Sequence, residues 1–593
     1  MYFTPLKQIP AASQTVNAFR GYNHNLRIAD GEFYDMQNLT GDFYPILSPR
    51  KKRGIDSARN PQVWNPEKSN PCAMADLDGL CFLSDGILFY GYQGGVYKSV
   101  DLELNEELPK ELIKFGSYLI VLPDKKYFNT QDPGDFGSIE AKYIADSEAT
   151  VFPYDLKNEK SFVIGAWSDT PPENPEDGTY WVDTSEKGNK LMQYSAAGDS
   201  WIQRRSYLKL SAVGIGTDFK EGDSVIIDCP DFPTDLKEVL KNGAQILAIG
   251  ENYIVIEAFP VQMENTGFSV ERRMPLMDFV FEHKNRLWGC RYGFALNGEF
   301  VNEIYVSKLG DFKNWNSFQG ISTDSYVASC GTDGPWTGAI SAMGYPLFFK
   351  ENYLHKVYGS YPAEYQMQVI PCRGVQEGCS KSLAVVNEVL FYKARSGVVY
   401  YDGSLPESIS DAFGGVQYAN AVAGAMLDKY YISMADSGGT YHLFCFDTEK
   451  KLWHREDHTR VDAFCTVKHE LHYIEHDTPF IHLIVGGTAI AEEQVQWFAE
   501  TGVLGLWEEE HKHIKRITVR MSMEPGARVR FLAEYDSVGG WKPLASIAGN
   551  RLDSFSIPLR PRRCDHMRLR IEGEGDAKIY SYTIIREKGS DRG

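Results

Sequence analysis

The sequence predicts an all-β protein: a β-propeller of six or seven blades with an inserted small β-rich domain and a C-terminal β-sandwich. Short runs rich in Tyr, Phe, Val and Leu recur between Gly, Asp and Asn turns, as strands and hairpins require. These runs repeat at intervals of about 40 residues over much of the chain. The last part of the chain alternates between apolar and polar residues, which is typical of a sheet with one buried face.

Length and composition set the number of domains. A chain of 593 residues is longer than one hydrophobic core usually supports, and 43% apolar with 24% charged residues is an ordinary globular composition. We therefore expect an N-terminal extended arm, a propeller interrupted by an insert, and a sandwich. The expected ranges are 1–60 for the arm, 61–130 and 276–497 for the propeller, 131–275 for the insert and 498–593 for the sandwich.

The arm contains the segment GEFYDMQNLTGDFYPILSPRKKRG, residues 31–54. Its prolines disfavour a helix, and its apolar side chains would be costly to leave in water, so we expect an ordered, extended segment. It either docks on a neighbouring subunit or packs on its own propeller, for example by supplying a strand that closes the ring of blades. The expected contacts are Tyr34, Leu39, Tyr44 and Ile46, followed by the charged Arg50 and Arg53.

The repeat itself consists of a turn followed by a strand with consecutive apolar residues. Successive units are separated by 38, 168, 60, 43, 41 and 41 residues when they are aligned on equivalent positions. Those positions are Cys81, Leu119, Leu287, Leu347, Leu390, Tyr431 and His472. The short steps match a propeller blade, and the step of 168 contains an insertion of roughly 130 residues. The alternative is an irregular sandwich with accidental spacing.

The insert and the C-terminal part have their own patterns. Trp181 and Trp201 flank turn residues, as in a hairpin with a small aromatic core, and the following strands suit a small barrel. In the C-terminal part, Arg516, Arg520, Arg568 and Arg570 fall on the polar side of the alternation, where they line either a solvated face or a contact face.

Charge is distributed unevenly along the chain. The net charge is −19, which disfavours a general nucleic-acid binder, yet from residue 511 onwards 17 Lys and Arg stand against 10 Asp and Glu. The basic end of one subunit is therefore suited to meet the acidic body of a neighbour, and a solvated surface is the alternative.

No motif for catalysis stands out. The sequence has no HExxH, GxSxG or phosphate-binding loop, and its ten cysteines include no CxxC pair, so we expect reduced thiols and no catalytic residues, metal or cofactor. His469, His472 and His476 lie close in sequence, but this spacing is more typical of strand and turn residues than of a metal site. No apolar run approaches membrane-spanning length, and we see no secretory signal.

Several segments together resemble a family of structural proteins encoded among the tail genes of phages and prophages of Gram-positive bacteria. They are the arm, NRLWGCRYG, NEIYVSKLGDFKNW, GYPLFFKENYLHKVYG, VVYYDGSLP and RPRRCDHMRLRIEGEGDAKIYS. That family is often compared with the packaged-DNA stabilisation or tail-hub proteins of short-tailed phages.

The resemblance implies a non-enzymatic virion component with a β-propeller body, assembled in the host cytoplasm. It further implies a homo-oligomeric ring, six-fold as one option, around the DNA channel or tail axis. Its partners would be other tail or connector proteins and genomic DNA that passes without sequence-specific binding. The alternatives are a tail-tip protein that binds a receptor or processes glycans, and a free bacterial carbohydrate-binding protein.

Overall fold

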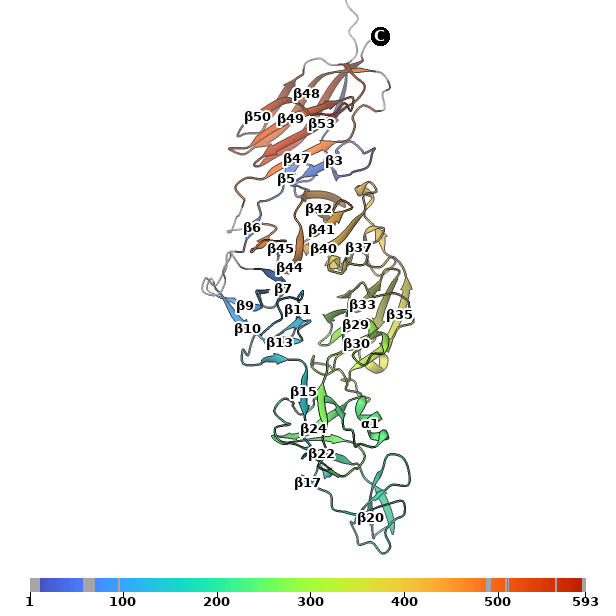
Figure 1. Cartoon of the computed structure of the whole chain (residues 1–593). Coiled ribbons are helices and arrows are strands. Elements are labelled where there is room, and N and C mark those ends of the chain that lie inside the picture. The colour runs from blue at the N-terminus through green and yellow to red at the C-terminus, as the bar shows by residue number, and fades with distance from the viewer. Residues whose placement is uncertain are drawn as a thin grey trace, which may run out of the picture.

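The chain forms three parts arranged along one long axis (Figure 1). A propeller lies in the middle, a sandwich that carries the C-terminal end lies on one side of it, and the insert lies on the other. This computed structural model describes residues 11–56, 70–93, 96–486, 492–506, 509, 511–559 and 563–588. Among these residues, no helix is long and apolar enough to cross a bilayer; the one α-helix is α1 (Thr234–Lys241).

The propeller has seven blades, each a four-stranded antiparallel sheet, so the predicted fold class is confirmed. The first strands of successive blades contact one another around the ring, for example β44 against β7 and β7 against β11. Each of the seven positions used to align the sequence repeats lies on the second strand of a blade. Each sequence repeat therefore corresponds to one blade, because in every blade a turn after the first strand leads into a buried second strand.

The strands of the first three blades are as follows. Blade 1 contains β7 (Pro71–Asp76), β8 (Leu80–Ser84), β9 (Ile87–Gln93) and β10 (Val96–Asp101). Blade 2 contains β11 (Glu111–Phe115), β12 (Tyr118–Leu122), β13 (Lys126–Asn129) and β14 (Phe136–Ser138). Blade 3 contains β28 (Phe279–Glu282), β29 (Leu287–Phe294), β30 (Phe300–Val306) and β31 (Tyr326–Ser329).

The remaining blades follow without a large interruption. Blade 4 contains β32 (Gly338–Ala342), β33 (Tyr345–Lys350), β34 (Tyr353–Tyr358) and β35 (Gln366–Pro371). Blade 5 contains β36 (Ala384–Val386), β37 (Val389–Ala394), β38 (Gly397–Tyr401) and β39 (Glu407–Ser408). Blade 6 contains β40 (Tyr418–Met426), β41 (Lys429–Asp436), β42 (Tyr441–Asp447) and β43 (Leu452–Asp457). Blade 7 contains β44 (Val461–Val467), β45 (Glu470–Glu475), β46 (Ile481–Leu483) and β6 (Gly54–Ile55).

Blade 7 shows how the ring closes. Its outer strand β6 comes from the N-terminal arm and pairs antiparallel with β46, more than 400 residues later in the chain. Phe82 and Phe89 of blade 1 share a buried cluster with Cys465 and Ile474 of blade 7. Closure therefore combines a strand from the start of the chain with an apolar seam between the first and last blades.

The insert leaves the propeller after blade 2 and returns before blade 3. Its larger sheet contains β15 (Ala141–Ile144), β16 (Thr150–Asp155), β17 (Lys160–Ser161), β22 (Tyr207–Ser211), β23 (Ser224–Asp228), β24 (Ala244–Gly250), β25 (Tyr253–Glu257), β26 (Met263–Glu264) and β27 (Ser269–Arg272). A smaller sheet, the tip sheet, contains β18 (Ile164–Ser168), β19 (Tyr180–Asp183), β20 (Lys190–Ser195) and β21 (Ser200–Gln203). The expected start at residue 131 is corrected to about 140, because 136–138 pair with β13 as the outer strand of blade 2.

Removing residues 141–273 and joining Glu140 to Met274 through two or three glycines should leave a folded propeller. The reason is that β15 and β27 are paired neighbours, with Ala141 opposite Arg272, so a short linker spans the gap. The insert also has its own buried core around Leu208, Ile227 and Ile256. Circular dichroism and a cooperative thermal transition of the shortened chain test this expectation, and a chain without a cooperative transition would contradict it.

The sandwich is built from both ends of the chain. One sheet contains β1 (Ala11–Val16), β54 (Ala577–Lys588), β48 (Lys512–Met523), β51 (Asp553–Pro558) and β52 (Arg563–Cys564). The other contains β2 (Gly21–Tyr22), β3 (Glu32–Gln37), β47 (Gln496–Thr501), β53 (Met567–Glu574), β49 (Arg528–Tyr535) and β50 (Lys542–Ala548). The largest buried cluster joins this sandwich, the arm and blades 4 to 6 in one continuous core.

Acid should destabilise the propeller, because three buried histidines and one half-buried histidine are held in the uncharged form. Burial lowers the pKa of His283, His355, His454 and His482 to about 4, against an ordinary value of about 6.5. Between these values the unfolded chain binds more protons, so the free energy of unfolding falls as pH drops below about 6.5 and levels off below about 4. We expect the free energy of unfolding to fall by on the order of 1 to 2 kcal/mol per histidine from pH 7 to pH 5.

Denaturant unfolding at pH 7, 6 and 5 measures this effect. His355→Gln should make the free energy of unfolding less dependent on pH, whereas the same substitution at the exposed His469 should leave that dependence unchanged. Equal unfolding midpoints at pH 7 and pH 5 would contradict the expectation.

Candidate functional site

The arm lies along a seam between the propeller and the sandwich. After β1 and β3 have joined the two sheets of the sandwich, β4 (Leu39–Thr40) and β5 (Ser48–Pro49) form a small hairpin, and β6 then enters blade 7. The hairpin also bridges to the sandwich through Leu47 and Ile579. The arm therefore packs on its own chain, which is the second of the two expected arrangements.

The charged end of the arm is buried in a cluster of ion pairs. Arg53 contacts Glu456 through Nη2 and Asp457 through Nη1, each at 2.7 Å. Arg50 donates two hydrogen bonds, of 2.7 and 2.8 Å, to the Glu492 carboxylate. These residues fix the arm to the outer strand of blade 6 and to the segment that leads into the sandwich.

Two carboxylates of this cluster, Asp457 and Glu492, are held in their charged form. Burial by itself raises the pKa of Asp457, but the guanidinium of Arg53 and hydrogen bonds from Thr459 outweigh it and lower that pKa below its usual range. Glu492 follows the same pattern, with burial opposed by Arg50, and its pKa is also lowered. The cluster is thus stabilised at neutral pH by mutual neutralisation of its charges.

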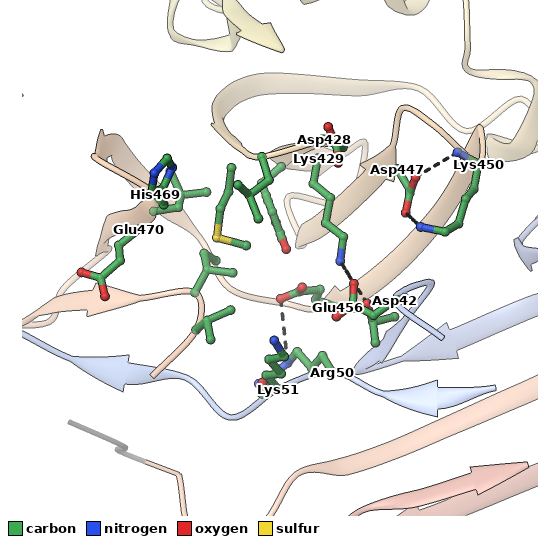
Figure 2. A pocket seen from close by; sticks show the side chains of 17 residues that line it. Asp42, Arg50, Lys51, Asp428, Lys429, Asp447, Lys450, Glu456, His469 and Glu470 are labelled. Atoms are coloured by element: carbon green, nitrogen blue, oxygen red, sulfur yellow. Dashed lines mark hydrogen bonds and ion pairs between the residues drawn. The ribbon is translucent and has the colours of Figure 1, made fainter. Parts of the chain in front are cut away.

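A cleft of about 470 Å³ lies beside this cluster, between blades 6 and 7 and the arm hairpin (Figure 2). Its floor is apolar and consists of Met426, Tyr431, Leu471, Ile484 and Val485, and the exposed Leu427 lies at its edge. Charged side chains surround the floor, and two ion pairs, Lys429 with Asp42 and Lys450 with Asp447, lie along one side. We call this space the interblade cleft.

Most charged side chains at the rim of the interblade cleft are paired, but Asp428 and Glu470 make no ion pair with another described residue. Burial raises the pKa of Asp42, yet Lys429 more than compensates, so that pKa is lowered. Glu456 and Arg50 belong to the ion-pair cluster of the arm. Lys51 is exposed and makes no ion pair with another described residue. An apolar floor inside a charged rim suits an apolar side chain of a binding partner.

The aromatic and aliphatic contacts expected in the arm lie in different environments. Leu39 is buried, Tyr34 and Ile46 are half-buried, and Tyr44 is 44% exposed. The deepest anchors of this segment are Phe33 and Met36, which the sequence analysis did not single out. Phe33 and Met36 are three residues apart in β3, so regular alternation would place them on opposite faces. A register shift between Phe33 and Asp35 in the pairing with β47 lets both side chains face the core.

The four arginines of the C-terminal part do not form one face. Arg516 and Arg520 lie exposed on β48 of one sheet, whereas Arg568 and Arg570 lie on β53 of the other. Arg568 and Arg570 both pair with Glu500 of the neighbouring strand β47. Because their charges are matched within the sheet, these two contribute less free positive charge to a contact than the sequence suggested.

Histidines 469, 472 and 476 are also separated by the fold. His472 is buried within blade 7, His476 contacts Asp462 at 2.7 Å, and His469 is exposed at the rim of the interblade cleft. Among the described residues, no group of three His, Cys, Asp or Glu side chains has the arrangement of a metal site.

Comparison with known proteins gives distant structural likenesses to β-propeller proteins. The Trypanosoma rangeli sialidase matches with a TM-score of 0.21 and 8% identity, over 98% of this chain and 97% of that one. The Phanerochaete chrysosporium exo-β-1,3-galactanase with galactose matches with a TM-score of 0.20 and 8% identity, over 51% and 94%. Chaetomium thermophilum Raptor matches with a TM-score of 0.28 and 8% identity, over 73% and 29%. No protein-family model and no curated protein matches this sequence.

Proposed function

We propose that this chain is a structural, non-enzymatic protein of a bacteriophage tail or head-to-tail assembly, in which several copies form a ring around the DNA channel or tail axis. The observation that carries the proposal is the seam made by the arm. It ties the propeller and the sandwich into one core, while the insert extends on the opposite side of the propeller. Such a body keeps two docking modules at a fixed separation, as a building block of an assembly needs.

The chemistry of the interblade cleft supports a binding role. Its lysines at 429 and 450 are paired with carboxylates, and its floor is apolar, so it offers a shaped contact surface. The sequence resemblance to phage tail-region proteins adds the biological setting. An acidic body around the axis would repel DNA phosphates and let the genome slide without sequence-specific binding.

A second candidate is a tail-tip role in receptor or glycan binding. The tip sheet of the insert favours it, because Trp181, Trp201 and Tyr194 cluster there with ring centroids 5.2 and 5.4 Å apart, and Trp167 is exposed nearby. Exposed aromatic rings can stack on sugar faces. Binding of the isolated protein to a glycan array, lost on Trp167→Ala with Trp201→Ala, would favour this candidate.

The test of the first proposal is the composition of virus particles. Particles induced from the strain that carries the gene, purified on a density gradient and analysed by mass spectrometry, should contain this chain in several copies per particle. The chain should turn over neither DNA nor polysaccharides. Expression of the chain in the lysate together with its absence from purified particles would overturn the proposal.

A further inference from the structure

Blade 3 carries an unusually apolar hairpin tip. The side chains of Phe294, Leu296 and Phe300, at the turn between β29 and β30, are 66%, 58% and 57% exposed. We call residues 294–300 the apolar finger. Three large apolar side chains side by side in solvent are costly, and such clusters on a protein surface mark contact sites.

The apolar finger is held in one shape. Ala295 donates a backbone hydrogen bond to Glu299 at 2.8 Å, and Gly298 donates one back to Ala295 at 2.9 Å. Phe300 packs edge-on against both Phe294 and Tyr292, with ring centroids 5.7 and 5.1 Å apart. The finger therefore presents its apolar surface in an ordered form and loses little conformational entropy when it binds.

The finger and the interblade cleft lie on opposite faces of the propeller. Each blade is an antiparallel meander, so its first and third turns lie at one face and its second turn at the other. The cleft is lined by the first and third turns of blade 6, at residues 427–428 and 448–450, and by the first turn of blade 7. The finger is the second turn of blade 3, and Figure 1 places blade 3 across the ring from blades 6 and 7.

We propose that the apolar finger of one copy of this chain docks in the interblade cleft of the next copy. This rests on the proposed assembly function and names the contact that builds it. The cleft, at about 470 Å³, has the size of a site that encloses a few side chains, and the exposed residue Leu427 at its edge is apolar like the finger. Because the finger and the cleft lie on opposite faces of the propeller, one neighbouring copy is not placed to engage both at once. The contact therefore joins copies head to tail, and closes into a ring when the rotation permits.

One pair of opposite charges can form at the rim beside the apolar contact. Glu299, in the turn of the finger, makes no ion pair with another described residue, and neither does Lys51 at the rim of the cleft. When the finger enters the cleft, this carboxylate and this ammonium can pair across the interface. An ion pair at the rim of an interface fixes how the two copies are oriented more than it strengthens their binding.

Two variants break the contact from opposite sides. The finger variant is Phe294→Ser with Leu296→Ser, and the cleft variant is Leu427→Asp. Leu427 has a positive φ of 52°, a conformation that Asp tolerates better than Leu, so the cleft variant should fold. Sedimentation velocity over a range of concentrations should show wild-type assemblies, with at least about tenfold weaker association for either variant. Leu552→Asp, an exposed change on the sandwich, is the matched control and should assemble normally.

Mixing the two variants tests directly whether the finger of one chain binds the cleft of another. The cleft variant still has a finger and the finger variant still has a cleft, so an equimolar mixture should form complexes of two chains and no larger species. Lys51→Glu should weaken wild-type association, and Glu299→Lys in the same chain should restore it. Wild-type chains that stay monomeric, variants that assemble normally, or a mixture without two-chain complexes would each overturn the proposal.

These outcomes separate the contact from the proposed function. If the chain is present in virus particles but its assembly ignores the finger and cleft variants, the finger contact is wrong while the assembly function stands. If the variants behave as expected but the chain is absent from particles, the contact is right and the phage setting is wrong.

Discussion

A chain that lacks residues 1–56 should not fold cooperatively. The deletion removes the outer strand of blade 7, two strands of one sandwich sheet and the edge strand of the other. It also removes Phe33, Met36 and Leu39 from the core that joins sandwich and propeller. Burial of each such side chain contributes roughly 1.5 to 3 kcal/mol, and a typical protein is stable by only about 5 to 15 kcal/mol.

The measurement is thermal unfolding by circular dichroism, together with size-exclusion chromatography. The truncated chain should elute as aggregate or lack a cooperative transition. The chain without the insert has lost more residues, but it should keep a cooperative transition. A synthetic peptide of residues 11–56 added during refolding should recover part of the folded chain. A truncated chain that unfolds cooperatively at the wild-type temperature would contradict this view of the arm.

Arg53→Ala should be among the most damaging single substitutions in the propeller. It removes the close 2.7 Å contacts of buried Glu456 and of Asp457, and leaves them only longer contacts of 3.8 and 3.9 Å to Arg50. Removing one partner of a buried ion pair typically costs about 3 to 5 kcal/mol, because the remaining charge stays buried and uncompensated. The lowered pKa of Asp457 depends on Arg53. On acidification, the free energy of unfolding of the variant should therefore fall less than that of the wild type.

Denaturant unfolding at pH 7 measures the first effect. Arg516→Ala is the matched control: this arginine is exposed on β48 and should change the free energy of unfolding by no more than about 0.5 kcal/mol. Equal effects of the two substitutions would show that the ion-pair cluster does not hold the arm.

The blades could be predicted because their signal is local. Every second strand, from the one at Cys81 to the one at His472, follows a turn and carries consecutive buried residues. A turn and an apolar run are visible within about ten residues of sequence, and their recurrence gives the period of the blade. The predicted start of the insert was too early, because the short strand at 136–138 carries no apolar pattern of its own.

The class of the fold, the repeat of about 40 residues and the need of the arm to be buried could be predicted from the sequence, which left six or seven blades open. The path of the arm and the identity of its anchors, by contrast, depend on contacts between distant parts of the chain. The partners of Arg53 lie about 400 residues away, and no local pattern reports a pairing across that distance. In β3 the adjacent Phe33 and Tyr34 are both aromatic, so composition cannot tell which one faces the core; the pairing of β3 with β47 fixes that choice, because a shift of one residue would exchange the two faces.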